Sequence, residues 1–172
     1  MTDASQLPAL DPERIFRVFA EHGVEYVLIG ALAARFAGYP LLTADADMTP
    51  SRSAENLGRL AAALREIDAR VFTVGVPEGL SFDCSAATLA RGEIWNLVTA
   101  AGRLDLVFFP PGGGDYDELL RHSSRYEVAG APVTAASLEA IVSMKEAADR
   151  PKDRQAVAII KAMLERDARR RS

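Results

Sequence analysis

Two aspartates, Asp45 and Asp47, are separated by a single residue in the stretch Thr43-Ala44-Asp45-Ala46-Asp47. Successive side chains of a β-strand point to opposite faces, so a strand here places both carboxylates on one face, with their Cα atoms roughly 6.5 Å apart. Carboxylate oxygens at that spacing suit a divalent cation, and ligation by oxygen alone selects Mg²⁺ or Mn²⁺. The pair therefore predicts a metal site.

An apolar run, Tyr26 to Ile29, precedes the pair and ends at Gly30, where a short alanine-rich segment begins. A strand that ends in glycine and opens a helix gathers free backbone N–H groups at the positive end of the helix dipole. We expect an anion such as a phosphate to bind there.

A third acid, Asp105, is the polar residue of an otherwise apolar run, Leu104-Asp105-Leu106-Val107-Phe108-Phe109. A strand of this kind is buried on both faces, and burial disfavours the charged carboxylate. One interpretation is an aspartate that a buried arginine or a backbone N–H satisfies. The other is that Asp105 lies beside Asp45 and Asp47. Carboxylates 4 Å apart repel by roughly 4 kcal/mol at an effective dielectric of 20, so three stay ionised together only among cations.

The two expected C-terminal helices each place a charge on an apolar stripe. Lys145 lies seven residues after Leu138, and Asp153 lies four residues before Val157. Taken singly, the lysine could extend to the edge of its stripe and the acid could answer the helix dipole. Taken together, inward charges of opposite sign on adjacent helices indicate an ion pair or a site. His22 and His122 lie near helix ends, far from the acids in sequence, and predict no zinc site.

The composition is typical of one globular domain, with 172 residues, 49% hydrophobic and 26% charged, and a net charge of -4. We expect a disordered lead-in over 1–10, one domain over 11–168 and a basic tail over 169–172, the tail being typical of a solvated, frayed helix end. The single cysteine, Cys84, has no disulfide partner, and no apolar run approaches the ~20 residues of a membrane span. These features, and the lack of a visible leader, indicate a cytoplasmic protein without membrane contact.

The order of elements predicts a mixed α/β (α+β) fold, with a small mixed β-sheet flanked by helices and two C-terminal helices. Asp11, Ser53, Asp115 and Ser137 are expected helix N-caps. Residues 75–79 are expected to form a turn, and 80–92 fit either a short strand or a helical turn. Helices are expected over 12–22, 54–67, 115–122, from 138 onward and over 151–166; strands over 24–29, 69–74, 94–99 and 103–109, the last two as a hairpin, with a second hairpin over 126–134.

The ordered set Gly30-Ala31, Asp45-Ala46-Asp47 and Asp105 resembles the polymerase-β-like nucleotidyltransferase superfamily, whose pattern is Gly-Gly or Gly-Ser, Asp-x-Asp, and an acid on a later strand. The later stretches, 144–148 and Arg150-Pro151-Lys152-Asp153, look like the lysine and Arg-x-Lys-Asp motifs of the AbiEii-type toxin branch. The resemblance spans roughly residues 24 to 160 and implies a minimal nucleotidyltransferase fold.

The resemblance also implies roles for particular residues and an NTP as substrate. Mg²⁺ or Mn²⁺ would be held against the triphosphate, and in-line attack on the α-phosphate would release pyrophosphate. The implied roles are: catalytic, Asp45, Asp47, Asp105, Lys145 and Asp153; metal-binding, Asp45, Asp47 and Asp105; nucleotide-binding, Gly30, Ala31, Thr43 and Lys145; acceptor-binding, Arg150 and Lys152.

Two positions depart from the family pattern. Ala31 stands where Gly or Ser is usual, so a hydroxyl contact to phosphate is missing, although the backbone N–H groups remain; Ala156 stands where toxin-like relatives often carry an acid.

Three hypotheses follow. The leading one is a nucleotidyltransferase that modifies a tRNA end or a protein hydroxyl, as the toxin of a toxin–antitoxin system. The second is transfer to a small molecule such as an antibiotic. The third is a catalytically weakened binding module or antitoxin that pairs with a toxin partner.

Overall fold

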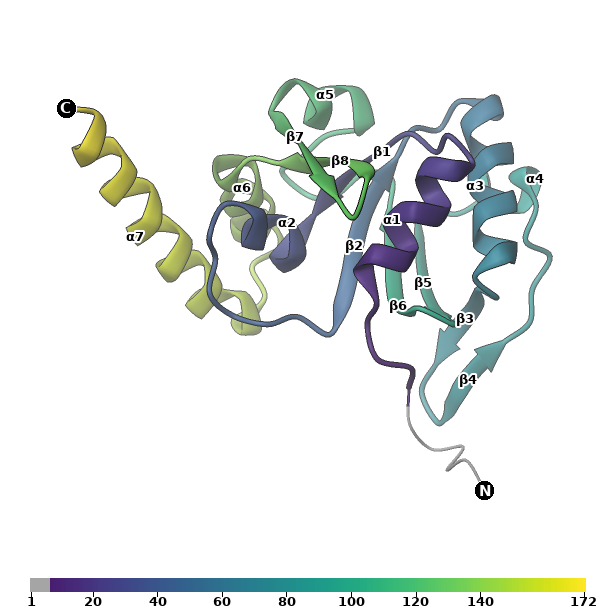
Figure 1. The fold of residues 1–172 in the computed structure, drawn as a ribbon. Helices are drawn as coiled ribbons and strands as arrows, with labels where there is room; N and C mark the ends of the chain where they lie inside the picture. The colour runs from purple at the N-terminus through teal and green to yellow at the C-terminus, as the bar shows by residue number, and fades with distance from the viewer. Residues whose placement is uncertain (1–6) are drawn as a thin grey trace.

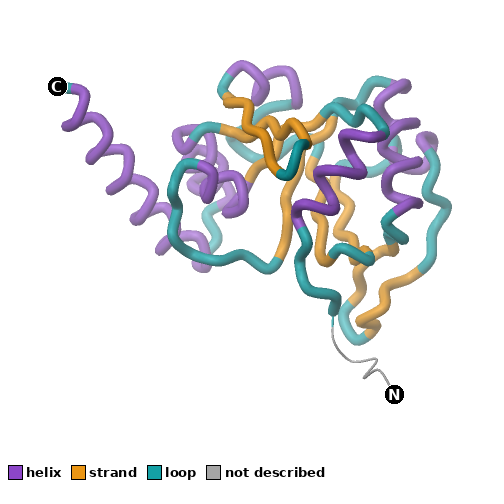
Figure 2. The backbone as a smooth tube through the Cα atoms, in the orientation of Figure 1, coloured by secondary structure: helices purple, strands orange, loops and turns teal. Residues whose placement is uncertain are grey.

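The computed structural model describes residues 7–172, which form one eight-stranded mixed sheet in the order β4-β3-β5-β6-β2-β1-β8-β7. Strands lie at the centre and helices on either side (Figures 1 and 2). The strands are β1 Tyr26–Ile29, β2 Asp45–Pro50, β3 Arg70–Thr73, β4 Val76–Leu80, β5 Ile94–Thr99, β6 Gly102–Val107, β7 Ser123–Val128 and β8 Ala131–Ala136. The helices are α1 Pro12–Glu21, α2 Gly30–Phe36, α3 Ala54–Glu66, α4 Ala86–Leu89, α5 Tyr116–Arg121, α6 Leu138–Ala148 and α7 Arg154–Arg171, with a 3₁₀ turn, η1, at Pro151–Asp153.

The strand β2 is the centre of the sheet. It pairs antiparallel with β1 and parallel with β6, and both registers pass through Asp47, which lies opposite Ile29 on one side and Asp105 on the other. The predicted hairpin of β5 and β6 is present. These pairings bring distant parts of the chain to one row across the sheet.

One face of β2 and β6 forms the core. Ala46, Met48, Leu104 and Leu106 are fully buried there, and they belong to one cluster with apolar residues of α1 and α3. The alternate residues Asp45, Asp47, Arg103, Asp105 and Val107 face the other way and are only partly buried. The alternation separates an apolar face from a face that carries charge.

All four predicted helix caps are confirmed. Asp11, Ser53, Asp115 and Ser137 each accept a hydrogen bond from the backbone N–H three residues later, at 3.1, 3.2, 3.0 and 3.2 Å respectively. Each cap satisfies one N–H that the first helical turn would otherwise leave unpaired.

The predicted turn over 75–79 is wrong, because Val76–Leu80 form the edge strand β4, paired with β3. Pro77 and Gly79 misled the prediction, yet an edge strand tolerates proline and a register irregularity accommodates a glycine with φ of 71°. The region 80–92, which was expected to form either a short strand or a helical turn, contains the single-turn helix α4.

The chain ends also differ in detail from the expectations. Of the expected lead-in 1–10, residues 1–6 lie outside the described part of the chain; residues 7–10 form neither helix nor strand, and Leu10 packs against the core. The last helix extends to Arg171, beyond the predicted end near Arg166, and includes most of the expected basic tail 169–172. Its C-terminal half projects from the body (Figure 1). In residues 7–172, no helix has the combination of length and apolarity that crossing a bilayer requires.

Asn56 fastens α3 to the sheet and was not singled out by the sequence. Its buried side chain accepts from the Glu25 N–H at 2.7 Å and donates to the carbonyls of Glu25 and Ser51 at 2.9 and 2.8 Å. We expect Asn56→Ala to lower the free energy of unfolding by about 2 to 3 kcal/mol, because it strands buried backbone groups. Urea unfolding measures this.

Gly58 on the same helix gives a matched control of opposite sign. A Cβ at this position would meet no atom within 4 Å. Gly58→Ala is therefore expected to stabilise the protein by about 0.5 to 1 kcal/mol. Equal effects of the two substitutions would contradict the role given to Asn56.

Candidate functional site

Three carboxylates converge on the partly buried face of the sheet. Asp47 and Asp105 are register partners on parallel strands, and Asp45 lies two residues before Asp47 on the same face. One carboxylate oxygen from each residue can be chosen so that all three lie within 4.8 Å of one another. The expected proximity of the three acids, here called the triad, is confirmed, and in residues 7–172 it is the one such cluster of potential metal ligands.

Burial and mutual repulsion make the triad electrostatically costly. Burial first, and then the charges of Asp45 and Asp105, raise the pKa of Asp47 from 3.8 to about 7, although Lys145 and Arg150 act in the opposite direction. Burial also raises the pKa of Asp105, against the charge of Arg103. A donor set of closely spaced carboxylate oxygens fits a divalent metal ion, whose charge favours the ionised carboxylates.

Gly30 makes room for this cluster. Its φ is 70°, and a Cβ at this position would overlap the Asp47 carboxylate, so two independent constraints require glycine. It begins α2, whose N-cap residue, Ile29, supplies no side-chain hydrogen bond to the first turn. The first N–H groups of α2 thus have no side-chain acceptor. Ala31, the next residue, packs its methyl group against the core.

Thr43 contacts the triad directly. Its hydroxyl lies 2.9 Å from Asp45 Oδ1 and 3.1 Å from the Asp45 backbone oxygen. The side chain therefore orients Asp45, and contact of Thr43 with a nucleotide stays a prediction.

The charges predicted on the last two helices form a buried ion-pair cluster. Lys145 Nζ lies 2.7 Å from Asp153 Oδ1, and Arg150 Nε lies 2.6 Å from Asp153 Oδ2. The Lys145 side chain is only 11% exposed, which excludes the interpretation that it extends into solvent. Asp153 lies in η1, before α7 begins. Burial alone would raise the pKa of Asp153, but the hydrogen bonds and charges of Lys145 and Arg150 outweigh it and hold that pKa below its usual range.

The ion-pair cluster and the triad influence each other. The charges of Lys145 and Arg150 oppose the rise in the pKa of Asp47, and the charge of Lys152 opposes the rise in that of Asp105. A hollow of about 360 Å³ lies between α6 and α7, lined by Lys145, Arg150, Asp153 and their neighbours. Arg150 and Lys152 are exposed, and Ala156 is buried in α7.

Sequence reasoning named a buried arginine as an alternative partner for Asp105 without identifying it. Arg103, two residues earlier on β6, donates from Nη2 to Asp105 Oδ1 at 3.3 Å. Asp105 therefore pairs with a partly buried arginine and also lies beside Asp45 and Asp47, so both interpretations are correct. The strand period of two was the available signal, because it places residues 103 and 105 on one face.

The two histidines lie apart from the triad, as expected. His22 pairs with Glu66 at 2.6 Å, and His122 is the exposed C-cap of α5.

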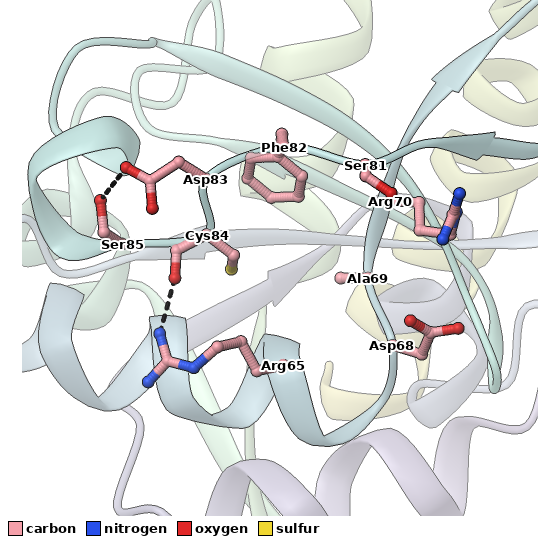
Figure 3. A pocket seen from close by; sticks show the side chains of 9 residues that line it. All are labelled: Arg65, Asp68, Ala69, Arg70, Ser81, Phe82, Asp83, Cys84 and Ser85. Carbon is pink, nitrogen blue, oxygen red and sulfur yellow. Dashed lines mark hydrogen bonds between the residues drawn. The ribbon is translucent and has the colours of Figure 1, made fainter.

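A second hollow, of about 440 Å³, lies near the β4 edge of the sheet (Figure 3). Its polar groups bond mainly to one another: Arg65 donates to the Cys84 carbonyl at 2.6 Å, and Ser85 donates to Asp83 at 2.9 Å. Burial raises the pKa of the Cys84 thiol, so it is a poor nucleophile. These contacts give the polar groups of the hollow a structural role.

Comparison with known proteins supports this description through structure. No protein-family model matches the chain, and no curated protein matches it by sequence. The solution structure of the antibiotic-resistance factor ANT(2'')-Ia is similar, with a TM-score of 0.55 and 19% identity over 89% of this chain and 82% of that one. The crystal structure of ANT(2'')-Ia in complex with adenylyl-2''-tobramycin gives a TM-score of 0.56 and 20% identity, over 89% of this chain and 87% of that one. The chain has the nucleotidyltransferase fold.

A third similar structure comes from Thermotoga maritima and is described as a nucleotidyltransferase. It gives a TM-score of 0.50 and 16% identity over 92% of this chain and 97% of that one. Such distant identity establishes the common fold of a nucleotidyltransferase and leaves the AbiEii-type branch unconfirmed.

The repulsion within the triad predicts a pH-dependent stability. Because the pKa of Asp47 is raised to about 7, the folded state holds its proton more tightly than the unfolded state, and stability falls as pH rises from about 4 through 7. We expect Asp47→Asn to raise the Tm of metal-free protein by several degrees at pH 8 and by less at pH 5, with 1 kcal/mol corresponding to about 2 to 4 °C.

Thermal melts with and without Mg²⁺ check this expectation. Mg²⁺ should stabilise the wild type and have little effect on Asp47→Asn. The exposed Asp167 at the end of α7 provides the control, since Asp167→Asn should leave both Tm values unchanged. An Asp47→Asn protein that melts no higher than wild type at pH 8 would be incompatible with repulsion in the triad.

Proposed function

We propose that the protein is a metal-dependent nucleotidyltransferase that transfers a nucleoside monophosphate from an NTP to an acceptor hydroxyl. The observation that carries the proposal is the triad, with three carboxylate oxygens within 4.8 Å of one another on adjacent strands. Its position in a nucleotidyltransferase fold, beside a buried lysine, supports the same chemistry.

Asp45, Asp47 and Asp105 would hold Mg²⁺ or Mn²⁺, which supplies positive charge against the triphosphate and the developing charge of the reaction. Thr43 keeps Asp45 oriented, and Gly30 leaves the space that Asp47 occupies.

Other groups on this side of the triad would bind the phosphates. The N–H groups at Gly30 and Ala31 are available to phosphate oxygens, because no side chain caps them. Lys145, fixed by Asp153, would neutralise phosphate charge.

The reaction forms one bond and breaks one at the α-phosphorus, and the proton of the acceptor hydroxyl passes to solvent. The acceptor oxygen bonds to the α-phosphorus while the bond from that phosphorus to the bridging oxygen of the β-phosphate breaks, and pyrophosphate leaves with the electron pair. Asp105 lies at the edge of the triad and would favour loss of the proton from the acceptor hydroxyl. Positioning and charge neutralisation supply most of the catalysis in this scheme.

The proposed acceptor is a tRNA end or a protein hydroxyl, with the chain acting as the toxin of a toxin–antitoxin pair. The exposed cations Arg150 and Lys152, which border the site, would contact such an acceptor. A second candidate is an antibiotic acceptor, which the fold likeness to ANT(2'')-Ia favours. A third is a weakened binding module or antitoxin, for which Ala31 is the reason, since its methyl group replaces a phosphate-binding hydroxyl.

Labelling with each α-³²P NTP tests the proposal. Purified protein would be incubated with Mg²⁺ and, separately, total RNA, total protein and a panel of aminoglycosides. We expect label on one acceptor, and a loss of about 100-fold or more in Asp47→Ala, because removing a group that stabilises transition-state charge typically costs that much. The exposed Asp117 on α5 is the matched control, and Asp117→Ala should label at the wild-type rate.

Three outcomes separate the candidates. Label on an aminoglycoside selects the antibiotic enzyme. Failure to bind any NTP with Mg²⁺, together with a cellular phenotype that Asp47→Ala leaves unchanged, would remove the enzymatic proposal. Co-purification with a partner protein that Asp45→Ala does not affect would then support the binding module.

A further inference from the structure

Arg103 is fixed beside Asp105 with hydrogen-bonding capacity to spare. Its guanidinium carbon lies 3.7 Å from the centroid of the Phe72 ring, and its Nη2 lies 3.3 Å from Asp105 Oδ1. Its Nε is buried and has no hydrogen-bond partner in residues 7–172. A guanidinium carries five N–H donors in a rigid fork, and stacking on an aromatic ring holds that fork in one orientation.

The strand order gives the two sides of the triad different surroundings. Gly30 and α2 follow β1 on one side of β2, and Asp105 lies on β6 on the other side, next to β5. Phosphates bound near Gly30 and Lys145 therefore leave the β5 side for the acceptor.

The sheet face on that side stays open beyond Asp105. Asn96 on β5 is the register partner of Asp105, and Ile94 is the partner of Val107, so both lie on the face of the triad. Asn96 is exposed and Ile94 is 58% exposed. An acceptor can thus lie along β5 with its hydroxyl next to Asp105.

Cationic side chains border this approach to the triad. Arg70 on β3 shares the face through its pairing opposite Val98, and Phe72 follows two residues later. Lys152 is close enough to Asp105 to lower its pKa. A polycationic acceptor would meet the positive charges of Arg103, Arg70 and Lys152 here, whereas those charges would attract a phosphate.

We propose that Arg103 is the specificity-determining residue for the acceptor: it binds a phosphate adjacent to the attacking hydroxyl, so that the site selects the end of an RNA strand and rejects polycationic aminoglycosides. This inference rests on the proposed nucleotidyltransferase function. Phe72 acts as a positioning residue, because it holds the guanidinium in place.

Fluorescence anisotropy with a 5'-fluorescein-labelled single-stranded RNA, in Mg²⁺, measures the predicted contact. We expect Arg103→Ala to weaken RNA binding about tenfold or more, as loss of a charge-assisted hydrogen bond does. Arg103→Lys should restore part of the affinity, and Arg17→Ala, which removes an exposed arginine on α1, should have no effect.

Two further measurements keep the result unambiguous. Ile94→Glu places an anion on the open face at an exposed position, and it should weaken RNA binding without disturbing the fold. Binding of a fluorescent NTP analogue with Mn²⁺ reports on the triad itself, and its affinity should change less than about twofold in Ile94→Glu, which does not contact the triad. In turnover assays both variants should raise KM for RNA more than they lower kcat.

The outcomes distinguish failure of the inference from failure of the proposed function. Intact NTP binding with RNA affinity unchanged in Arg103→Ala and Ile94→Glu overturns the role of Arg103 alone, as does preferential transfer to tobramycin or to protein. Absence of NTP binding in the wild type removes the proposed function and, with it, the role of Arg103.

Discussion

Electrostatic repulsion among three carboxylates is the constraint around which the structure is arranged. The parallel register of β2 and β6 places Asp47 directly beside Asp105, and Asp45 completes the cluster. Burial and repulsion raise the pKa of Asp47 to about 7, so the cluster opposes the stability of the fold at neutral pH. Cations bound among the carboxylates would remove this repulsion. Perturbed pKa values of this kind are typical of functional sites.

Cations on two sides of the triad supply positive charge to it. On the side of the last two helices, Lys145 and Arg150 are held by Asp153 and face Asp47. On the side of β5, Arg103 is held by Phe72 and contacts Asp105. Each cation is positioned by a second group, which limits the rearrangement needed when substrates bind. In the proposed function, Lys145 serves the NTP, and Arg150 and Arg103 serve the acceptor.

Sequence predicted the parts of the site that depend on local pattern. The spacing of Asp45 and Asp47 fixed their common face, and the helix caps followed from residue type. Asp105 was predicted to lie beside them, because burial in an apolar strand disfavours a charged carboxylate unless it belongs to a site or an ion pair. The register that places Asp105 beside Asp47 could not be predicted, because register between strands is a tertiary property. Arg103 could have been found, because the strand period of two places it on the same face as Asp105. Pro77 shows where local pattern misleads. It predicted a turn over 75–79, but the chain forms an edge strand there, and an edge strand tolerates proline.

In the proposed function, the triad binds a divalent metal ion that the reaction requires. Crystals grown with Mn²⁺ and a non-hydrolysable NTP analogue, with diffraction recorded at the manganese absorption edge, test it directly. An anomalous peak is expected within coordination distance of Asp45, Asp47 and Asp105, with triphosphate oxygens on the same ion. A map with nucleotide bound but no peak at these carboxylates, or with manganese only at other residues, would contradict it.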